Sequence, residues 1–437
     1  MVPTNKGNEN NLEKGISTSI IKHLAKIQLE INNSQSELID DNTVAAKPAD
    51  LRVVLLADDE TLHSYGPALR RMAVGLIDEV GELSLLCTND SHLLEYVPSP
   101  PVRLIRQIKK FQQISRRENL SRRQITVTAN RFGILPGLWP RRQAAHFSEA
   151  LAPCKPTLLH ALSERQTRLA QNLSEQLQIP YLVSLLSLDS DVFKYIGPRC
   201  GKILPCNSQT ARSVQQGRPN LAKRIQLMPI GTHVMEQACC YRHGQAKPQI
   251  FCCGRFDYHH GFPDLINAVK RLADLKHQFH LTLSGEGPAE HDLRQQVKQL
   301  GLIQCVHFVP PIETMLPTSE IYKTVLQAAD IFIQPWPSKT WRPELMESMS
   351  VGNVIIVAEG SKNDLVINGK TALTIPFHNE KALTEVLDLV LKDREYAQRL
   401  ARQSQEFLRK HFLVSRMIAR LAKAYREALQ FSAFKTN

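Results

Sequence analysis

The chain has 437 residues, a formal net charge of +12 and an ordinary hydrophobic content of 43%. It is long enough for two or three domains with full cores. No run approaches the roughly 18 apolar residues of a membrane-spanning helix, and the first ten residues lack the apolar core of a signal peptide. We therefore expect a cytoplasmic protein. Nine cysteines without metal-ligand spacing predict structural thiols rather than a metal or redox site.

The first half of the chain begins with a polar, Asn-rich segment and continues as alternating strands and helices. We expect residues 1–50 to form a mobile N-terminal extension. Short apolar segments separated by helical ones predict βαβ units and a parallel sheet covered on both faces, here a Rossmann-like domain of residues 51–235. Strands are expected at 52–57, 83–87, 157–162, 181–186 and 201–206, and helices at 67–80 and 164–177.

A strongly basic segment interrupts this pattern. Residues 103–142 hold eleven Lys or Arg against the single acid Glu118, and apolar residues recur at helical spacing along residues 102–111. Two interpretations remain open. The segment is either a solvated basic helix or a contact through residues 102–142 with an anionic membrane, which would make the protein peripheral on the inner membrane face. No recognised nucleic-acid-binding module accompanies the charge, so we do not expect nucleic acid as a partner.

The alternation then restarts and predicts a second doubly wound domain, residues 236–412, followed by a C-terminal helix in residues 413–437. Ligands of open α/β sheets bind at the carboxyl ends of the strands. Two such domains that face each other would therefore enclose a binding cleft. Strands are expected at 249–253, 279–283, 306–309, 331–334 and 354–357, and helices at 262–274, 290–300, 321–328, 343–350, 383–391 and 415–429.

An ordered series of short motifs fills residues 249–376. The series consists of Gly254-Arg255-Phe256 with Gly261, then the segments 284–288, 329–335, 344–350 and 368–373. In this order and spacing it resembles the nucleotide-sugar-binding half of GT-B glycosyltransferases, specifically the retaining family 4. The resemblance implies a metal-independent transfer of a sugar from a nucleotide-sugar donor to a glycan or lipid-linked acceptor, with no cofactor. It also implies that the final helix crosses back onto the first domain.

The resemblance assigns donor-binding roles to individual residues. Glu347 matches the family's Glu that holds the ribose, and Arg255 matches the Arg that reaches the diphosphate. His260 stands where the family has a second, phosphate-binding Lys, and a neutral imidazole still offers one hydrogen-bond donor. Gly285 and Glu286 belong to the glycine loop that lies beside the nucleotide.

Several positions depart from the family pattern. Eight residues before Glu347 the family has a Glu that engages the transferred sugar, and here Lys339 stands there. Pro343 removes a backbone donor but suits the first position of a helix. We expect Lys339 and Arg342 to supply cations for the phosphates, and a plain basic loop is the alternative. Leu186 stands where the family often has a His.

One further candidate lies in the first domain. Asp189-Ser190-Asp191 matches a metal motif of another glycosyltransferase fold, but its position in a GT-B-like chain argues against a metal, and none is expected. Asp189 remains the candidate for an acceptor-side base. The departures favour an alternative function, a non-catalytic GT-B-like protein that binds a ligand or partners an active transferase. The presence of Arg255 and Glu347 favours the enzyme.

Overall fold

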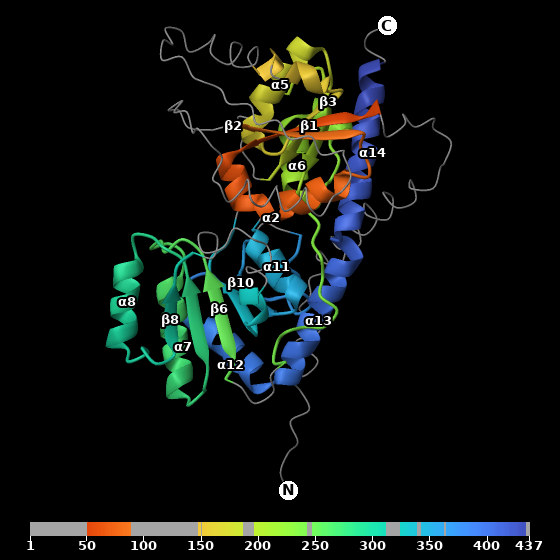
Figure 1. The fold of residues 1–437 in the computed structure, drawn as a ribbon. Helices are drawn as coiled ribbons and strands as arrows, with labels where there is room; N and C mark the ends of the chain where they lie inside the picture. The colour runs from red at the N-terminus through yellow and green to blue at the C-terminus, as the bar shows by residue number, and fades with distance from the viewer. Residues whose placement is uncertain are drawn as a thin grey trace. The chain divides into compact units, whose positions relative to one another are not determined.

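The fold contains two parallel sheets (Figure 1). The computed structural model describes residues 50–88, 147–149, 151–186, 196–242, 247–311, 324–338, 342–361 and 364–433. One sheet has five strands in the order β2-β1-β3-β4-β5, and the other has six in the order β11-β10-β9-β6-β7-β8. This confirms the predicted class of two doubly wound α/β domains. The expected extension, apart from residue 50, and the basic segment 102–142 lie outside the described residues.

The first sheet is built largely where the sequence predicted it. Its strands are fully buried along most of their length, as expected for a sheet with both faces covered. Its elements are β1 Arg52–Asp58, α2 Asp59–Leu76, β2 Glu82–Thr88, β3 Leu158–Ala161, α5 Thr167–Leu177, β4 Tyr181–Leu185, β5 Cys200–Pro205 and α6 Ser208–Gly217, with 3-10 turns at Ala152–Cys154, Glu164–Gln166 and Pro219–Arg224.

Helix α2 starts eight residues earlier than predicted, because Asp58 caps it. The Thr61 backbone N–H donates to Asp58 Oδ1 at 2.6 Å, and Gln166 Nε2 donates to Asp58 Oδ2 at 3.1 Å. A side-chain oxygen at this position satisfies a backbone donor of the first turn. Helix α6 was not predicted; it begins in the same way, with Asn207 accepting from the Thr210 backbone N–H at 2.8 Å.

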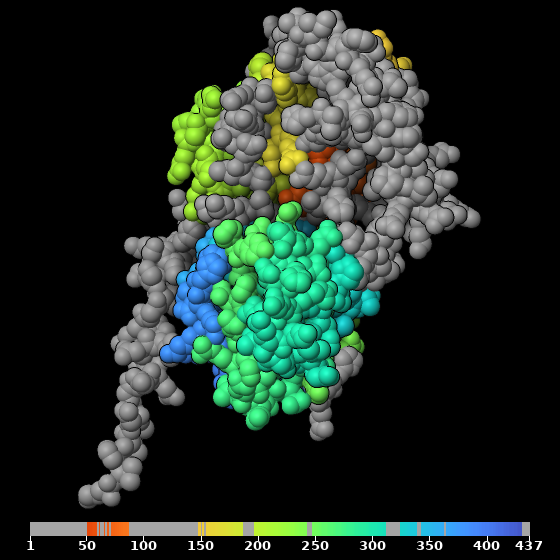
Figure 2. Space-filling model, turned by 90° about the vertical axis from the view of Figure 1, so that its left-hand side faces the viewer, coloured from red at the N-terminus to blue at the C-terminus, as the bar shows by residue number. Residues whose placement is uncertain are grey.

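The second sheet follows the prediction closely, and its helices α7 and α8 are seen in green and teal in Figure 1. The green and teal atoms of this part of the chain form much of the lower surface in Figure 2. Two elements, β11 and α13, were not predicted. Its elements are β6 Gln249–Cys253, α7 Phe262–Asp274, β7 His280–Ser284, α8 Glu290–Gln299, β8 Val306–Val309, β9 Ile331–Gln334, α11 Pro343–Val351, β10 Val354–Ala358 and β11 Leu373–Ile375, followed by α12 Glu380–Lys392, α13 Arg394–His411 and α14 Val414–Ala433.

The last two helices pack against different sheets. Helix α13 contacts α11 and β10, whereas α14 contacts α2 and β5 of the first sheet. The approach of α14 is close, since a Cβ added to Gly201 would lie 2.7 Å from Ala428 Cβ. In the short connection from α13 to α14, Phe412 O accepts a hydrogen bond from the Thr232 backbone N–H at 2.8 Å. None of the helices in the described part of the chain has both the length and the apolar character to cross a membrane.

Candidate functional site

Two loops at the carboxyl edge of the second sheet pack backbone against backbone. The Phe256 N–H donates to Glu286 O at 2.9 Å, and the Gly254 N–H donates to Ser284 O at 3.0 Å. A Cβ at Gly285 would lie 2.0 Å from Gly254 O, so only glycine fits there. The predicted glycine loop therefore fixes the loop after β6, while the Glu286 side chain stays exposed.

His260 is held in one orientation and one tautomer. Its ring stacks on Trp336, with centroids 4.7 Å apart and an interplanar angle of 19°. Its Nδ1 lies 2.8 Å from the backbone oxygen of Arg255. Because a carbonyl oxygen only accepts, Nδ1 carries the proton, and Nε2 of the neutral ring is an acceptor. The one donor that the sequence attributed to a neutral imidazole is thus already engaged.

The N-terminus of α11 lies at the same edge. The helix begins at Pro343, as predicted, and among the described residues no side-chain capping hydrogen bond is made by its N-cap residue Arg342. Arg342 precedes it, with Nε 3.4 Å from Glu344 Oε2 and Nη2 3.7 Å from the position of a Cβ on Gly254. Arg255, beside Gly254, is exposed. Two guanidinium groups and an open helix N-terminus make this edge attractive to anions such as a diphosphate.

Glu347, the predicted ribose ligand, is buried and already paired. Arg71 Nη2 lies 2.5 Å from Glu347 Oε1, and the two side chains are only 10% and 2% exposed. Thr232 Oγ1 lies 3.4 Å from Oε1 and 3.3 Å from Oε2. Neither partner was predicted from the sequence, because Arg71 is 276 residues away along the chain and Thr232 is 115.

A second polar contact joins elements of the two sheets. The Ser208 backbone N–H donates to Asp364 Oδ2 at 2.7 Å, and Ser208 Oγ donates to Asp364 Oδ1 at 2.5 Å. Ser208 is the first residue of α6, so the carboxylate of Asp364 lies at the positive end of that helix. The segment after β10 is thereby fixed to α6.

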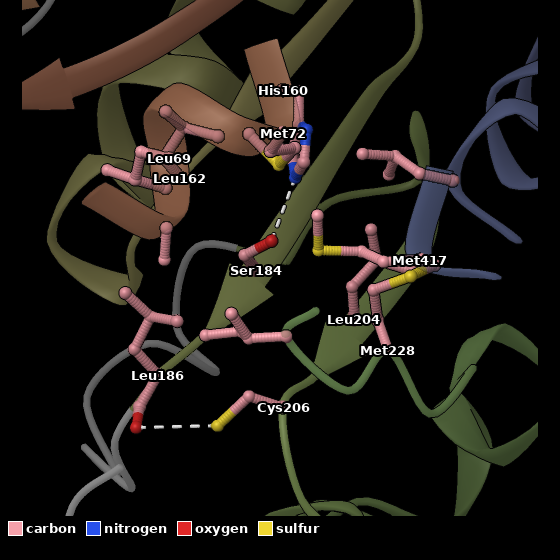
Figure 3. A pocket seen from close by; sticks show the side chains of 13 residues that line it. Leu69, Met72, His160, Leu162, Ser184, Leu186, Leu204, Cys206, Met228 and Met417 are labelled. Carbon is pink, nitrogen blue, oxygen red and sulfur yellow. Dashed lines mark hydrogen bonds between the residues drawn. The ribbon is translucent and has the colours of Figure 1, made fainter. Parts of the chain in front are cut away.

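The first sheet holds a small apolar pocket at the carboxyl ends of β3, β4 and β5 (Figure 3). Its cavity volume is about 30 Å³, and Leu186 forms part of its wall and is 4% exposed. The position at which the sequence resemblance led us to look for a His is therefore an apolar wall here. Other lining residues include Leu69, Met72, Leu162, Met228 and Met417.

The polar side of this pocket is a chain of three hydrogen-bonded side chains. His160 Nε2 lies 2.9 Å from Ser184 Oγ, and His160 Nδ1 lies 2.8 Å from the Tyr425 hydroxyl. Burial lowers the pKa of His160 to about 3, so the ring is neutral at physiological pH. These two hydrogen bonds link β3 and β4 to α14.

Two predicted site residues, Asp189 and Lys339, lie outside the described residues, so the structure does not place them. Of the remaining predicted site residues, five belong to the loops at one edge of the second sheet: Arg255, His260, Gly285, Glu286 and Arg342. Glu347 lies within α11. Within the described ranges, no three or more His, Cys, Asp or Glu side chains are grouped so that they could hold a metal ion.

Comparison with known proteins finds a family match in the second half of the chain. Residues 241–407, less than half of the chain, match the model of the family described as glycosyl transferases group 1. An uncharacterized glycosyltransferase, YqgM of Bacillus subtilis, is 23% identical over 259 residues, which are 56% of this chain and 70% of that protein. A glycogen synthase of Mycobacterium tuberculosis is 26% identical over 165 residues, which are 38% of this chain but only 39% of the synthase.

Solved structures extend the likeness of fold to most of the chain. A glycosyltransferase from Rickettsia africae superposes with a TM-score of 0.66 at 12% identity, over 87% of this chain and 99% of that one. HepE of Anabaena, crystallised in complex with UDP, gives a TM-score of 0.63 at 13% identity, over 85% and 99%. The chain therefore has the GT-B glycosyltransferase fold, as its sequence motifs predicted.

Proposed function

We propose that this protein transfers a sugar from a nucleotide-sugar donor to a glycan or lipid-linked acceptor, without a metal ion and with retention of configuration. One observation carries the proposal: Arg255, Arg342 and the uncapped N-terminus of α11 lie at the carboxyl edge of the second sheet. Ligands of open α/β sheets bind at such an edge. The family match over residues 241–407 and the UDP complex of HepE support a nucleotide-sugar donor.

In this proposal the diphosphate lies against the guanidinium groups and the helix N-terminus. These groups would stabilise the negative charge that develops on the leaving nucleotide, which is the part a metal ion plays in other transferases. Glu347 would accept hydrogen bonds from the ribose hydroxyls. Gly285 would let the donor approach the backbone of the loop, and Glu286 is exposed beside it. No cofactor is required by this chemistry.

The test is calorimetric binding of UDP-, GDP- and ADP-sugars to the wild-type protein and to Arg255→Ala and Arg342→Ala. Each variant should weaken binding of one donor by about tenfold or more, because a charge-assisted hydrogen bond to phosphate is lost. Arg271→Ala is the matched control, since Arg271 is an exposed arginine of α7 that pairs with Glu380. Failure of all three donor classes to bind the wild-type protein would refute the proposal.

A non-catalytic role is the second candidate, and the apolar wall at Leu186 and the paired state of Glu347 favour it. A GT-B-like protein that only binds a ligand needs neither a sugar-handling side chain at position 186 nor an accessible Glu347. Lys339→Glu separates the two functions. A large gain in transfer would mean that the site is otherwise competent, whereas donor binding without transfer in both forms would support the binding role.

We propose that the protein acts in the cytoplasm, at the inner face of a membrane, with residues 102–142 contacting anionic lipid. The eleven basic residues of 103–142 support this. Co-sedimentation with vesicles of phosphatidylglycerol, but not of phosphatidylcholine alone, is the expected result. Loss of sedimentation in a variant with Arg116, Arg117, Arg122 and Arg123 changed to Gln would place the contact in this segment. Equal sedimentation with both lipids would contradict it.

A further inference from the structure

The carboxylate of Glu347 is held from two directions by residues outside its own helix. Arg71, on α2, pairs with Oε1 at 2.5 Å, and the Thr232 hydroxyl lies within hydrogen-bond distance of both oxygens. Since only 2% of the Glu347 side chain is exposed, a ribose hydroxyl cannot reach the carboxylate while these contacts persist. A donor that uses Glu347 must displace one of them.

Buried apolar residues adjoin both partners of this ion pair in sequence. Met72 follows Arg71 and is 7% exposed, and Met346 precedes Glu347 and is fully buried. A buried ion pair can often be replaced by apolar side chains without loss of stability, because the cost of removing two charges from water offsets their attraction. An ion pair at the predicted ribose site therefore suggests a role in ligand binding.

We propose that Arg71 and the donor ribose compete for the carboxylate of Glu347. This inference rests on the proposed function. In the donor-free protein, Arg71 holds the carboxylate; when the donor binds, the ribose hydroxyls take it over. Arg71 keeps a hydrogen bond after the exchange, since its Nε also donates to Gly231 O at 3.3 Å. The exchange leaves neither the carboxylate nor the guanidinium unpaired.

The competition couples donor binding to the contact between α2 and α11. Part of the binding free energy separates Arg71 from Glu347, so the donor binds more weakly than the open carboxylate would allow. By thermodynamic linkage, any change that weakens the ion pair strengthens ribose binding, and a bound ribose weakens the ion pair. Arg71 thus determines the affinity for the donor without contacting its ribose.

The experiment measures UDP and inorganic pyrophosphate binding by calorimetry for the wild-type protein, Arg71→Met and Arg71→Lys. We expect Arg71→Met to bind UDP about tenfold tighter, within the usual range of such couplings, and Arg71→Lys to show a smaller gain. Pyrophosphate has no ribose, so its affinity should not change. A general effect on the fold would shift both ligands together. Arg426→Met is the matched control, because it removes the Arg426–Glu79 ion pair, which lies outside the site.

The outcomes separate this inference from the proposed function. UDP binding to the wild-type protein that is unchanged or weakened in both Arg71 variants would overturn the competition and leave the function standing. No binding of UDP, GDP or ADP to the wild-type protein would overturn both. Should Arg71→Met not fold, amide hydrogen exchange of the wild-type protein decides: UDP should speed exchange in residues 69–76 of α2, and slower or unchanged exchange there contradicts the inference.

Discussion

His260 stacks on Trp336 and points its protonated Nδ1 at the backbone oxygen of Arg255. In this tautomer Nε2 of the neutral ring only accepts hydrogen bonds, so His260 offers no donor to a phosphate.

This geometry predicts that a lysine at position 260 strengthens donor binding. His260→Lys should bind UDP roughly three- to tenfold tighter than the wild-type protein, because it offers one charge-assisted hydrogen bond to phosphate that the neutral ring does not. Calorimetry measures the two affinities. His259→Lys adds the same charge to the neighbouring residue and should not reproduce the gain; equal UDP affinity of His260→Lys and the wild-type protein would contradict the prediction.

The contact of Gly285 with Gly254 O predicts a large effect of a single methyl group. Gly285→Ala places a Cβ 2.0 Å from that oxygen and should cost about 2–3 kcal/mol of unfolding free energy through overpacking. It should also displace the loop that carries Arg255 and abolish UDP binding. Urea denaturation and calorimetry measure the two effects.

The control for this substitution is Gly217→Ala, at a site with no atom within 4 Å of the added Cβ. It should change stability by no more than about 1 kcal/mol, and in the stabilising direction, because alanine has less freedom in the unfolded chain. A Gly285→Ala protein as stable as Gly217→Ala would show that the two loops do not pack as described.

The buried His160 predicts how stability depends on pH. Its folded pKa of about 3 lies below the ordinary value of 6.5, so the unfolded state takes up a proton that the folded state does not. The free energy of unfolding that the neutral His160 ring contributes is fully present above about pH 6.5. It is lost as the pH falls toward 3, by at most about 1.4 kcal/mol per pH unit.

His160→Gln should flatten that part of the curve, at a cost in stability near pH 7 because Ser184 and Tyr425 lose their shared partner. Chemical denaturation at intervals between pH 4 and pH 8 measures the slope for each protein. His259→Gln, at an exposed position, should leave the wild-type slope unchanged. A His160→Gln curve parallel to that of the wild type would contradict the assignment.

The Asp364–Ser208 contact predicts local loosening of α6. Asp364→Ala removes two hydrogen bonds to a charged group and should cost about 1–2 kcal/mol. Asp364→Asn keeps one acceptor oxygen and should cost less. Denaturation gives the total, and amide exchange in residues 208–212 gives the local effect. Exchange there that does not change in Asp364→Ala would mean that the contact does not hold the helix.

The sequence predicted the second sheet well because its elements are short, apolar and separated by clear turn residues. Pro343 marked the start of α11, and the strands at 249–253, 306–309 and 331–334 coincide with β6, β8 and β9. The polar helices α6 and α13 were missed because few apolar residues mark their periodicity. Helix α2 was placed too late because its start depends on Asp58, a capping residue whose role was not recognised.

The site was predictable only where motif order carries information. Arg255, His260, Gly285 and Arg342 lie at one edge of the sheet because each follows or precedes an element with a recognisable pattern. Their binding roles, and those of Glu286 and Glu347, stay predictions. Arg71 and Thr232 could not have been found, since nothing local marks an arginine within a helix or a threonine after a glycine as the partner of a carboxylate far along the chain.

The hydrogen bond from Thr232 to Phe412 has a mechanical consequence. The chain passes between the region of the first sheet and that of the second at 231–232 and again at 412–413, and these two passages lie side by side. Helices α13 and α14, which contact different sheets, are separated only by Phe412 and Leu413. Any turning of one sheet against the other must therefore flex both passages together, because the hydrogen bond from Thr232 to Phe412 couples them.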